Sequence, residues 1–200
     1  MAILKIARMG HPVLRQPAEA VHAPHHPEIQ RLIADMIDTM TDAEGVGLAA
    51  PQVHVSQRII VFYVPAHRAD APEGEATDAG NGMAEDGAEV PLSVLINPQF
   101  EPLDSRQTTD WEGCLSIPGL VGRVPRYRKI RYWGLDARGR KVVREAEGFH
   151  ARVVQHECDH LDGVLYLERM EDISSLCFTS ERGRAGGDED PRPAPVGDVA

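Results

Sequence analysis

The stretch QHECDH at residues 155–160 decides how this chain folds, because it contains the pattern HExxH. His156 and His160 are four residues apart, so on an α-helix both imidazole rings project from one face toward one metal ion. Glu157 stands beside them, where a carboxylate can accept a proton. A polar surface helix is the alternative that the pattern alone leaves open. We therefore predict a helix over residues 149–161 that carries a metal site.

A catalytic metal site keeps three protein ligands and leaves the fourth position to water, so a third ligand has to exist elsewhere. The ligand spacings of familiar zinc proteases are absent. A third histidine spaced as in metzincins would fall on Tyr166. The downstream glutamate ligand of thermolysin-like enzymes would have to be Glu168, Glu171 or Glu181. The first two follow the HExxH motif too closely for that role, and Glu181 begins a polar tail.

Cys114 is the better candidate for the third ligand. It stands in the segment WEGCLSIPG at 111–119, where Gly113 allows the backbone to pass close to a ligand. A buried cysteine without a ligand role is the alternative. Cys158 lies roughly 200° around the helix from each histidine and cannot reach the same ion. We interpret Cys158 and Cys177 as packing residues.

Length and composition predict one domain, with residues 1–180 as the catalytic unit. The chain has 200 residues, 42% of them hydrophobic, which is enough for a single core. Its net charge of -10 argues against specific nucleic-acid binding or an anionic membrane partner. We see neither a membrane-spanning apolar run nor a secretory signal and expect a cytoplasmic protein. Three cysteines, an odd number, fit free thiols or metal ligands better than disulfides.

Much of the negative charge lies in residues 66–90, which contain seven acids and one base. This segment is rich in alanine and glycine and has almost no large apolar side chains, so it cannot offset its ordering entropy. We predict a mobile acidic loop there. The tail at 181–200 is rich in glycine, proline and acids, and we predict that it is disordered.

Hydrophobic periodicity predicts the remaining elements. Residues 27–44 place their apolar side chains on one face of a long N-terminal amphipathic helix. Residues 45–52 form a small-residue segment that we interpret as a loop, and 58–64 form a β-branched strand. After the acidic loop, we predict a strand at 93–97. A turn at 136–139 joins a β-hairpin whose strands span 128–135 and 141–144. The expected class is α+β, with antiparallel strands packed around a central HExxH helix.

Three segments together resemble the motifs of the peptide deformylase family. They are GVGLAAPQ at 45–52, EGCLS at 112–116 and QHECDH at 155–160, in the same order and with similar spacing. The resemblance covers about residues 3 to 175. It implies a metal-dependent hydrolase that removes the formyl group from the N-terminal methionine of nascent polypeptides, at the ribosome exit, and releases formate.

The resemblance also implies roles for individual residues. Cys114, His156 and His160 would hold a divalent metal, ferrous iron in many members and zinc in others, with Ni²⁺ or Co²⁺ compatible with the same ligands. Glu157 would act first as general base and then as general acid. The backbone N–H of Leu115 and the side-chain amide of Gln52 would stabilise the oxyanion.

Substrate contacts are expected in the first motif and on the HExxH helix. Gly45 and Gly47 would let the loop run beside the peptide, with Gly47 donating or accepting a backbone hydrogen bond. Val46 and Val153 are candidate walls of the methionine pocket, although both fit an ordinary core equally well. We expect Glu112 to orient the first loop through a contact behind the metal ligands.

Two other functions remain open at this point. A zinc peptidase would use the same HExxH pattern to cleave internal peptide bonds, and the identity of the third ligand distinguishes it. A non-catalytic metal module on the ribosome would need four protein ligands, and no fourth ligand is evident near Cys114 or the HExxH helix.

Overall fold

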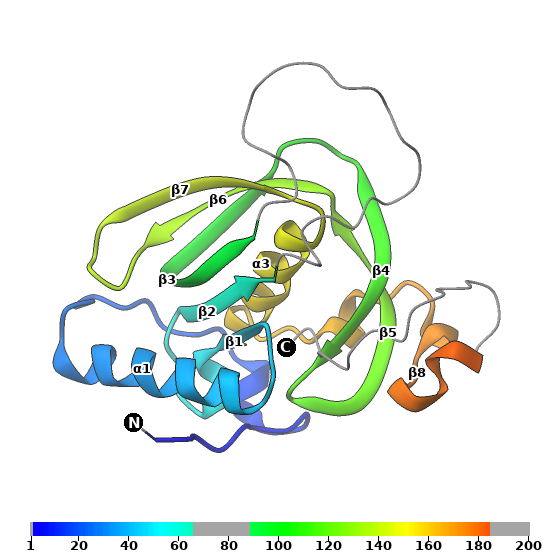
Figure 1. Ribbon diagram of the computed structural model, residues 1–200, viewed down its shortest axis with the longest axis horizontal. Helices are drawn as coiled ribbons and strands as arrows, with labels where there is room; N and C mark the ends of the chain where they lie inside the picture. Colours follow the sequence, from blue (N-terminus) through cyan, green and yellow to red (C-terminus); the bar gives the residue numbers. More distant parts are fainter. Residues whose placement is uncertain (1, 66–88, 185–200) are drawn as a thin grey trace.

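A computed structural model describes residues 2–65 and 89–184, which form an α+β fold with two antiparallel sheets (Figure 1). The larger sheet has the strand order β1-β2-β3-β6-β7, and each neighbouring pair is antiparallel. Its strands are β1 Gly47–Ala49, β2 Ile59–Val64, β3 Val90–Pro102, β6 Lys129–Leu135 and β7 Lys141–Glu147. The smaller sheet has the order β4-β5-β8, with β4 Gln107–Cys114, β5 Ile117–Tyr127 and β8 Cys177–Phe178.

Strand β2 shows why the larger sheet is covered on both faces. Its apolar run is almost continuous, and successive side chains point to opposite faces. Ile59 and Val61 join the cluster formed with helix α1, Pro27–Asp42, whereas Ile60 and Phe62 join the cluster formed with helix α3, Gly148–Leu161. Burying each such side chain contributes about 1.5–3 kcal/mol. The two helices therefore pack on opposite faces of β2.

Helix α3 is buried along nearly its whole length, from Ala151 to Leu161. It contacts β1, β2, β3, β6 and β7 of the larger sheet and β5 of the smaller one. Figure 1 shows α3 between the strands of the two sheets. A surface helix would keep a polar face toward water. The polar side chains of α3 are instead enclosed by protein, which can shield a metal site from bulk solvent.

Short 3-10 helices complete the described chain: η1 Pro12–Arg15, η2 Ala50–Val53, η3 Tyr166–Arg169, η4 Ile173–Ser175 and η5 Thr179–Arg184. Among the described residues, no helix combines the length and the apolar character that crossing a bilayer requires.

The antiparallel α+β class is confirmed, but several boundaries differ from the prediction. Residues 45–52 are not simply a loop, because β1 pairs with β2 and Ala50 begins η2. Val90, predicted to end the acidic loop, is buried at the start of β3, and the rest of that loop up to residue 88 lies outside the described residues. The predicted tail begins too early, because η5 continues to Arg184; residues 185–200 lie outside the described chain.

Candidate metal centre

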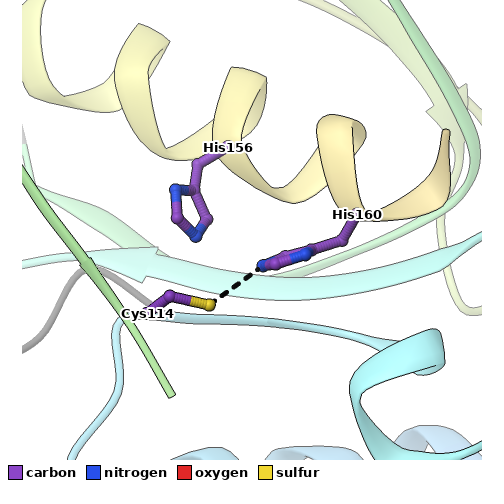
Figure 2. A group of neighbouring side chains, drawn as sticks. All are labelled: Cys114, His156 and His160. Atoms are coloured by element: carbon purple, nitrogen blue, oxygen red, sulfur yellow. Dashed lines mark hydrogen bonds between the residues drawn. The ribbon is translucent and has the colours of Figure 1, made fainter. Parts of the chain in front are cut away.

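Three side chains converge between β4 and α3 (Figure 2). Cys114 is the last residue of β4, and His156 and His160 occupy successive turns of α3. Their potential ligand atoms all lie within 4.8 Å of one another, and each residue is only 1% exposed. The Cys114 Sγ and His160 Nε2 atoms are 3.4 Å apart. The structure thus brings together the predicted Cys/His/His set, and Cys158 lies in the apolar core instead.

Buried polar atoms without partners mark this site as incomplete. His156 Nε2, His160 Nδ1 and both Glu157 carboxylate oxygens have no hydrogen-bond partner among the residues that the structure describes. Buried polar groups in folded proteins are nearly always paired. Burial, helped by the neighbouring His156 and Arg126, lowers the pKa of His160 well below its ordinary value, so this ring is neutral and can offer a lone pair. The unpaired His156 Nε2, together with Cys114 and the neutral ring of His160, fits a bound cation.

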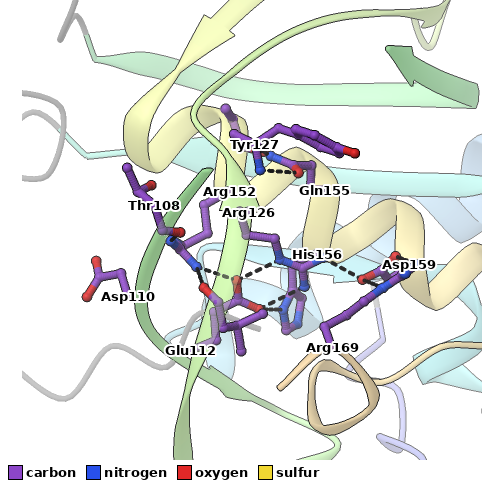
Figure 3. A network of polar contacts seen from close by, with 12 residues as sticks. Thr108, Asp110, Glu112, Arg126, Tyr127, Arg152, Gln155, His156, Asp159 and Arg169 are labelled. Carbon is purple, nitrogen blue, oxygen red and sulfur yellow. Dashed lines mark hydrogen bonds and ion pairs between the residues drawn. The ribbon is translucent and has the colours of Figure 1, made fainter. Parts of the chain in front are cut away.

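Glu112 holds His156 in position from behind (Figure 3). Its Oε2 lies 2.9 Å from His156 Nδ1, and its two oxygens accept bonds of 2.8 and 2.9 Å from Arg126 Nε and Nη2. Arg152 Nη1 adds a third cationic contact of 2.8 Å. Although burial favours the neutral acid, the Arg126 guanidinium and His156 keep the pKa of Glu112 well below its ordinary value. Within residues 2–65 and 89–184, the Glu112 carboxylate bonds to these three side chains and not to residues 45–52, so the expectation that it orients the first loop is wrong.

The charged network extends further along α3. Arg126 also pairs with Asp159, and Asp159 receives bonds of 3.1 and 2.7 Å from Arg169 of η3. Sequence reasoning missed these arginines and Asp159, because their partners come from distant segments. One local signal existed: Arg152 precedes His156 by four residues, so it shares the helix face of both histidines.

Gln52 reaches the same site from η2. Its Oε1 accepts a 2.8 Å bond from the Ala49 backbone N–H, which fixes the direction of the amide. Its Nε2 then points toward Cys114 Sγ, at 3.6 Å, and Ser116 Oγ, at 3.3 Å. The side chain is fully buried. A neutral donor beside the Cys/His/His set can stabilise a developing negative charge.

The remaining predicted residues surround this centre less directly. Val46 and Val153 are buried in one core cluster, together with residues of β2 and α3. Gly47 opens β1 and pairs with Phe62 of β2, at the edge of the larger sheet. Leu115 is half-buried in the turn between β4 and β5, next to Cys114.

Comparison with known proteins places these residues in a family context. The family model for polypeptide deformylase matches residues 3–175. The chain is 46% identical to peptide deformylase 1 of Nitrosomonas europaea over 177 residues, which covers 88% of this chain and 93% of the relative.

Solved structures of deformylases match as well. A peptide deformylase from Ehrlichia chaffeensis superposes with a TM-score of 0.73 at 30% identity and covers 92% of this chain and 93% of its own. A class I type b peptide deformylase from Acinetobacter baumannii, bound to Met-Ala-Ser, gives a TM-score of 0.71 at 33% identity, with coverages of 84% and 99%.

Proposed function

Because the chain belongs to the polypeptide deformylase family, we propose that Cys114, His156 and His160 hold one divalent metal ion and that Glu157 moves the protons of the reaction. The chain is a metal-dependent hydrolase that removes the N-formyl group from the N-terminal methionine of nascent polypeptides and releases formate. The observation that carries the residue assignment is the convergence of the three ligand atoms within 4.8 Å.

The ligand set fits a borderline or soft divalent ion. One sulfur and two neutral imidazoles accept Fe²⁺, Zn²⁺, Ni²⁺ or Co²⁺. Burial raises the pKa of the Cys114 thiol to about 12, so a nearby cation is needed to stabilise its thiolate. When bound, such an ion lowers the pKa of water and polarises the formyl oxygen. We propose Fe²⁺ as the ion used in cells, which makes Cys114 sensitive to oxidation.

Glu157 has the burial and the pKa that proton transfer requires. Its carboxyl group is fully enclosed, and burial raises its pKa well above the ordinary value, with Glu112 adding to the rise and Arg126 opposing it. A carboxyl group tuned toward neutral pH can both take and give a proton. Glu157 takes a proton from water as the water oxygen bonds to the formyl carbon. It passes that proton to the amine nitrogen as the C–N bond breaks, which gives formate and a free N-terminus.

Two donors are placed to stabilise the oxyanion formed during this attack. Gln52 is held by Ala49 so that its amide N–H group faces the Cys114 side of the site. The backbone N–H of Leu115, in the turn after Cys114, is the second proposed donor. Each such donor contributes about 3 to 4 kcal/mol in comparable acyl-transfer sites.

The substrate peptide is proposed to lie along β1. This strand stands at the edge of the larger sheet, where an extended peptide can add main-chain hydrogen bonds. Gly45 and Gly47 allow the close approach, and Gly47 is the proposed hydrogen-bonding partner. Val46 and Val153, buried in one cluster, are the proposed apolar contacts of the methionine side chain.

The cellular setting follows from the reaction and the charge. We propose that residues 1–180 act as one catalytic domain, around α3 as the central helix, in the cytoplasm near the ribosome exit. The net charge of -10 favours recognition of the emerging peptide over binding to nucleic acid or an anionic membrane.

Formate release from formyl-Met-Ala-Ser tests the proposal. We compare the wild type with Glu157→Gln, both purified under nitrogen and checked for metal content. The variant keeps the volume of the side chain and replaces the carboxyl group by an amide that does not titrate, so we expect kcat to fall about 10²- to 10⁴-fold with the metal retained. Equal kcat values at equal metal content would refute the role of Glu157.

A further inference from the structure

Arg152 is a buried charged residue that has no role in the proposed reaction. It is 3% exposed and projects from α3, one helical turn before His156. Burying a guanidinium is costly unless its charge and its donors are satisfied. Its Nη1 donates to Glu112 Oε1 at 2.8 Å and to the Val124 carbonyl at 2.8 Å, and its Nη2 donates to the Thr108 carbonyl at 2.9 Å. Arg152 therefore ties together α3, β4 and β5.

Arg152 and His156 hold the same carboxylate from one face of α3. Arg152 contacts Oε1 of Glu112, and His156 Nδ1 lies 2.9 Å from Oε2 (Figure 3). Residues four apart on a helix lie one above the other, so the two side chains reach Glu112 from successive turns. Glu112 cannot move away from His156 without breaking its contact to Arg152.

The charge balance of the cluster also depends on Arg152. Its buried members are two arginines, Arg126 and Arg152, and two carboxylates, Glu112 and Asp159. Arg169, which is half-exposed, pairs with Asp159, so the loss of Arg152 removes a buried positive charge from Glu112, beside Glu157. Arg126 cannot replace it, because its guanidinium is already shared between Glu112 and Asp159.

The position of Glu112 decides which nitrogen of His156 faces the metal site. A carboxylate acceptor at Nδ1 requires the proton there and leaves the lone pair on Nε2. Of the two ring nitrogens of His156, Nε2 is buried, has no hydrogen-bond partner among the described residues and lies on the side of Cys114 and His160. The arrangement is a carboxylate–histidine pair in which the carboxylate itself is clamped by Arg152.

We propose that Arg152 is a positioning residue for the metal ligand His156, and that it raises metal affinity by fixing Glu112 rather than by touching the metal or the substrate. This inference rests on the proposed metal site. Residues behind metal ligands typically change metal affinity about 10- to 100-fold, and Arg152 acts through one intermediate, so we expect about 10-fold.

Competition for Zn²⁺ against a chromophoric chelator measures this effect without any activity assay. We compare wild type, Arg152→Met, Glu112→Gln and the double variant. Arg152→Met is expected to weaken Zn²⁺ binding about 10-fold, whereas the same change in the Glu112→Gln background weakens it less than about 3-fold, because the route through Glu112 is already broken. The control is Arg131→Met, an arginine paired with Glu145 and Glu101 at the surface of β6, which should bind Zn²⁺ like the wild type.

A second readout follows the imidazole directly. In metal-free wild-type protein, ¹⁵N NMR should show the proton of His156 on Nδ1, and Arg152→Met should shift this ring toward a mixture of both tautomers. If Arg152→Met does not fold, Arg152→Lys, which keeps the charge but not the three contacts, takes its place in both measurements.

The outcomes separate this inference from the metal site itself. Wild-type protein that fails to bind Zn²⁺ refutes the proposed metal site. Wild-type protein that binds Zn²⁺, with an Arg152 variant of equal affinity and unchanged His156 tautomer, refutes only the positioning role. An equal loss of affinity in the wild-type and Glu112→Gln backgrounds also overturns it, because Arg152 would then act through another route.

Discussion

Replacing Gln52 by leucine tests the oxyanion role with a side chain of similar volume. The substitution removes the Nε2 donor beside Cys114 and also removes the acceptor of the Ala49 N–H, a 2.8 Å bond. Loss of one oxyanion donor lowers kcat about 10²- to 10³-fold. Leaving the buried Ala49 N–H unpaired costs about 1–3 kcal/mol of folding stability. The two effects are measured separately.

Gln155→Leu is the matched control for stability. Gln155 is also a buried glutamine and precedes His156, but its amide pairs with backbone groups: with Tyr127 of β5 at 3.0 and 2.8 Å, and with the Ala151 carbonyl at 3.0 Å. We expect it to lose similar stability in urea denaturation and to keep kcat within about 5-fold. The assay is formate release from formyl-Met-Ala-Ser at saturating substrate and equal metal content. A Gln52→Leu enzyme with kcat within about 5-fold of wild type would refute the oxyanion role, and so would an equally large loss in Gln155→Leu.

Three further predictions concern the fold. Burial, aided by Arg144, lowers the pKa of His150 to about 4, so between pH 6.5 and 4 the unfolded chain binds a proton that the folded chain does not. The free energy of unfolding should therefore fall by about 3 kcal/mol as the pH is lowered across this window. His150→Phe should remove that loss in urea titrations at several pH values. Met36→Ala, at a fully buried site of α1, should cost about 2–5 kcal/mol while kcat is unchanged; a smaller loss would contradict the packing of α1 on the sheet. Gly163→Ala, at a φ of +75° and with the new Cβ 2.7 Å from the Arg15 carbonyl carbon, should lower the melting temperature and cost more than about 1 kcal/mol, and an unchanged melting temperature would refute the strain.

The sequence predicts those elements whose local signal agrees with their environment. Helix α1 follows from its apolar face, and the β6–β7 hairpin follows from its turn, where Asp136 accepts bonds from the Arg138 and Arg140 N–H groups and Gly139 has a φ of +69°. Strand β1 was missed because three small residues carry no strand pattern of their own. Its stability comes from pairing with β2, which no local pattern reveals.

Strand β3 was predicted too short for a related reason. Asn97, with a φ of +53°, and the following Pro98 look like a break, but they lie in an irregularity where the pairing of β3 with β6 shifts register. Pro118 is also of a residue type that usually interrupts a strand, but it lies within β5. Asn97, Pro98 and Pro118 have backbone restrictions that usually interrupt a strand, but β3 and β5 continue through them.

The three metal ligands of the candidate site were predictable from the sequence, but the residues that hold these ligands in place were not. HExxH spacing defines His156 and His160, and the missing third ligand directs attention to Cys114. The clamp formed by Arg152 and Arg126 on Glu112 joins segments far apart in sequence, so only the folded chain reveals it. An arginine on a helix is ordinarily expected at the surface, which is why Arg152 gave no signal by its residue type.

X-ray absorption spectroscopy of protein purified under nitrogen tests the central claim most directly, because it counts the sulfur and nitrogen ligands of the bound metal. We predict about one metal ion per chain, with one sulfur at about 2.3 Å and two imidazole nitrogens at about 2.0–2.1 Å for the zinc form. Cys114→Ser should remove the sulfur signal. A metal-loaded protein that shows no sulfur ligand, or that keeps it in Cys114→Ser, would contradict the account.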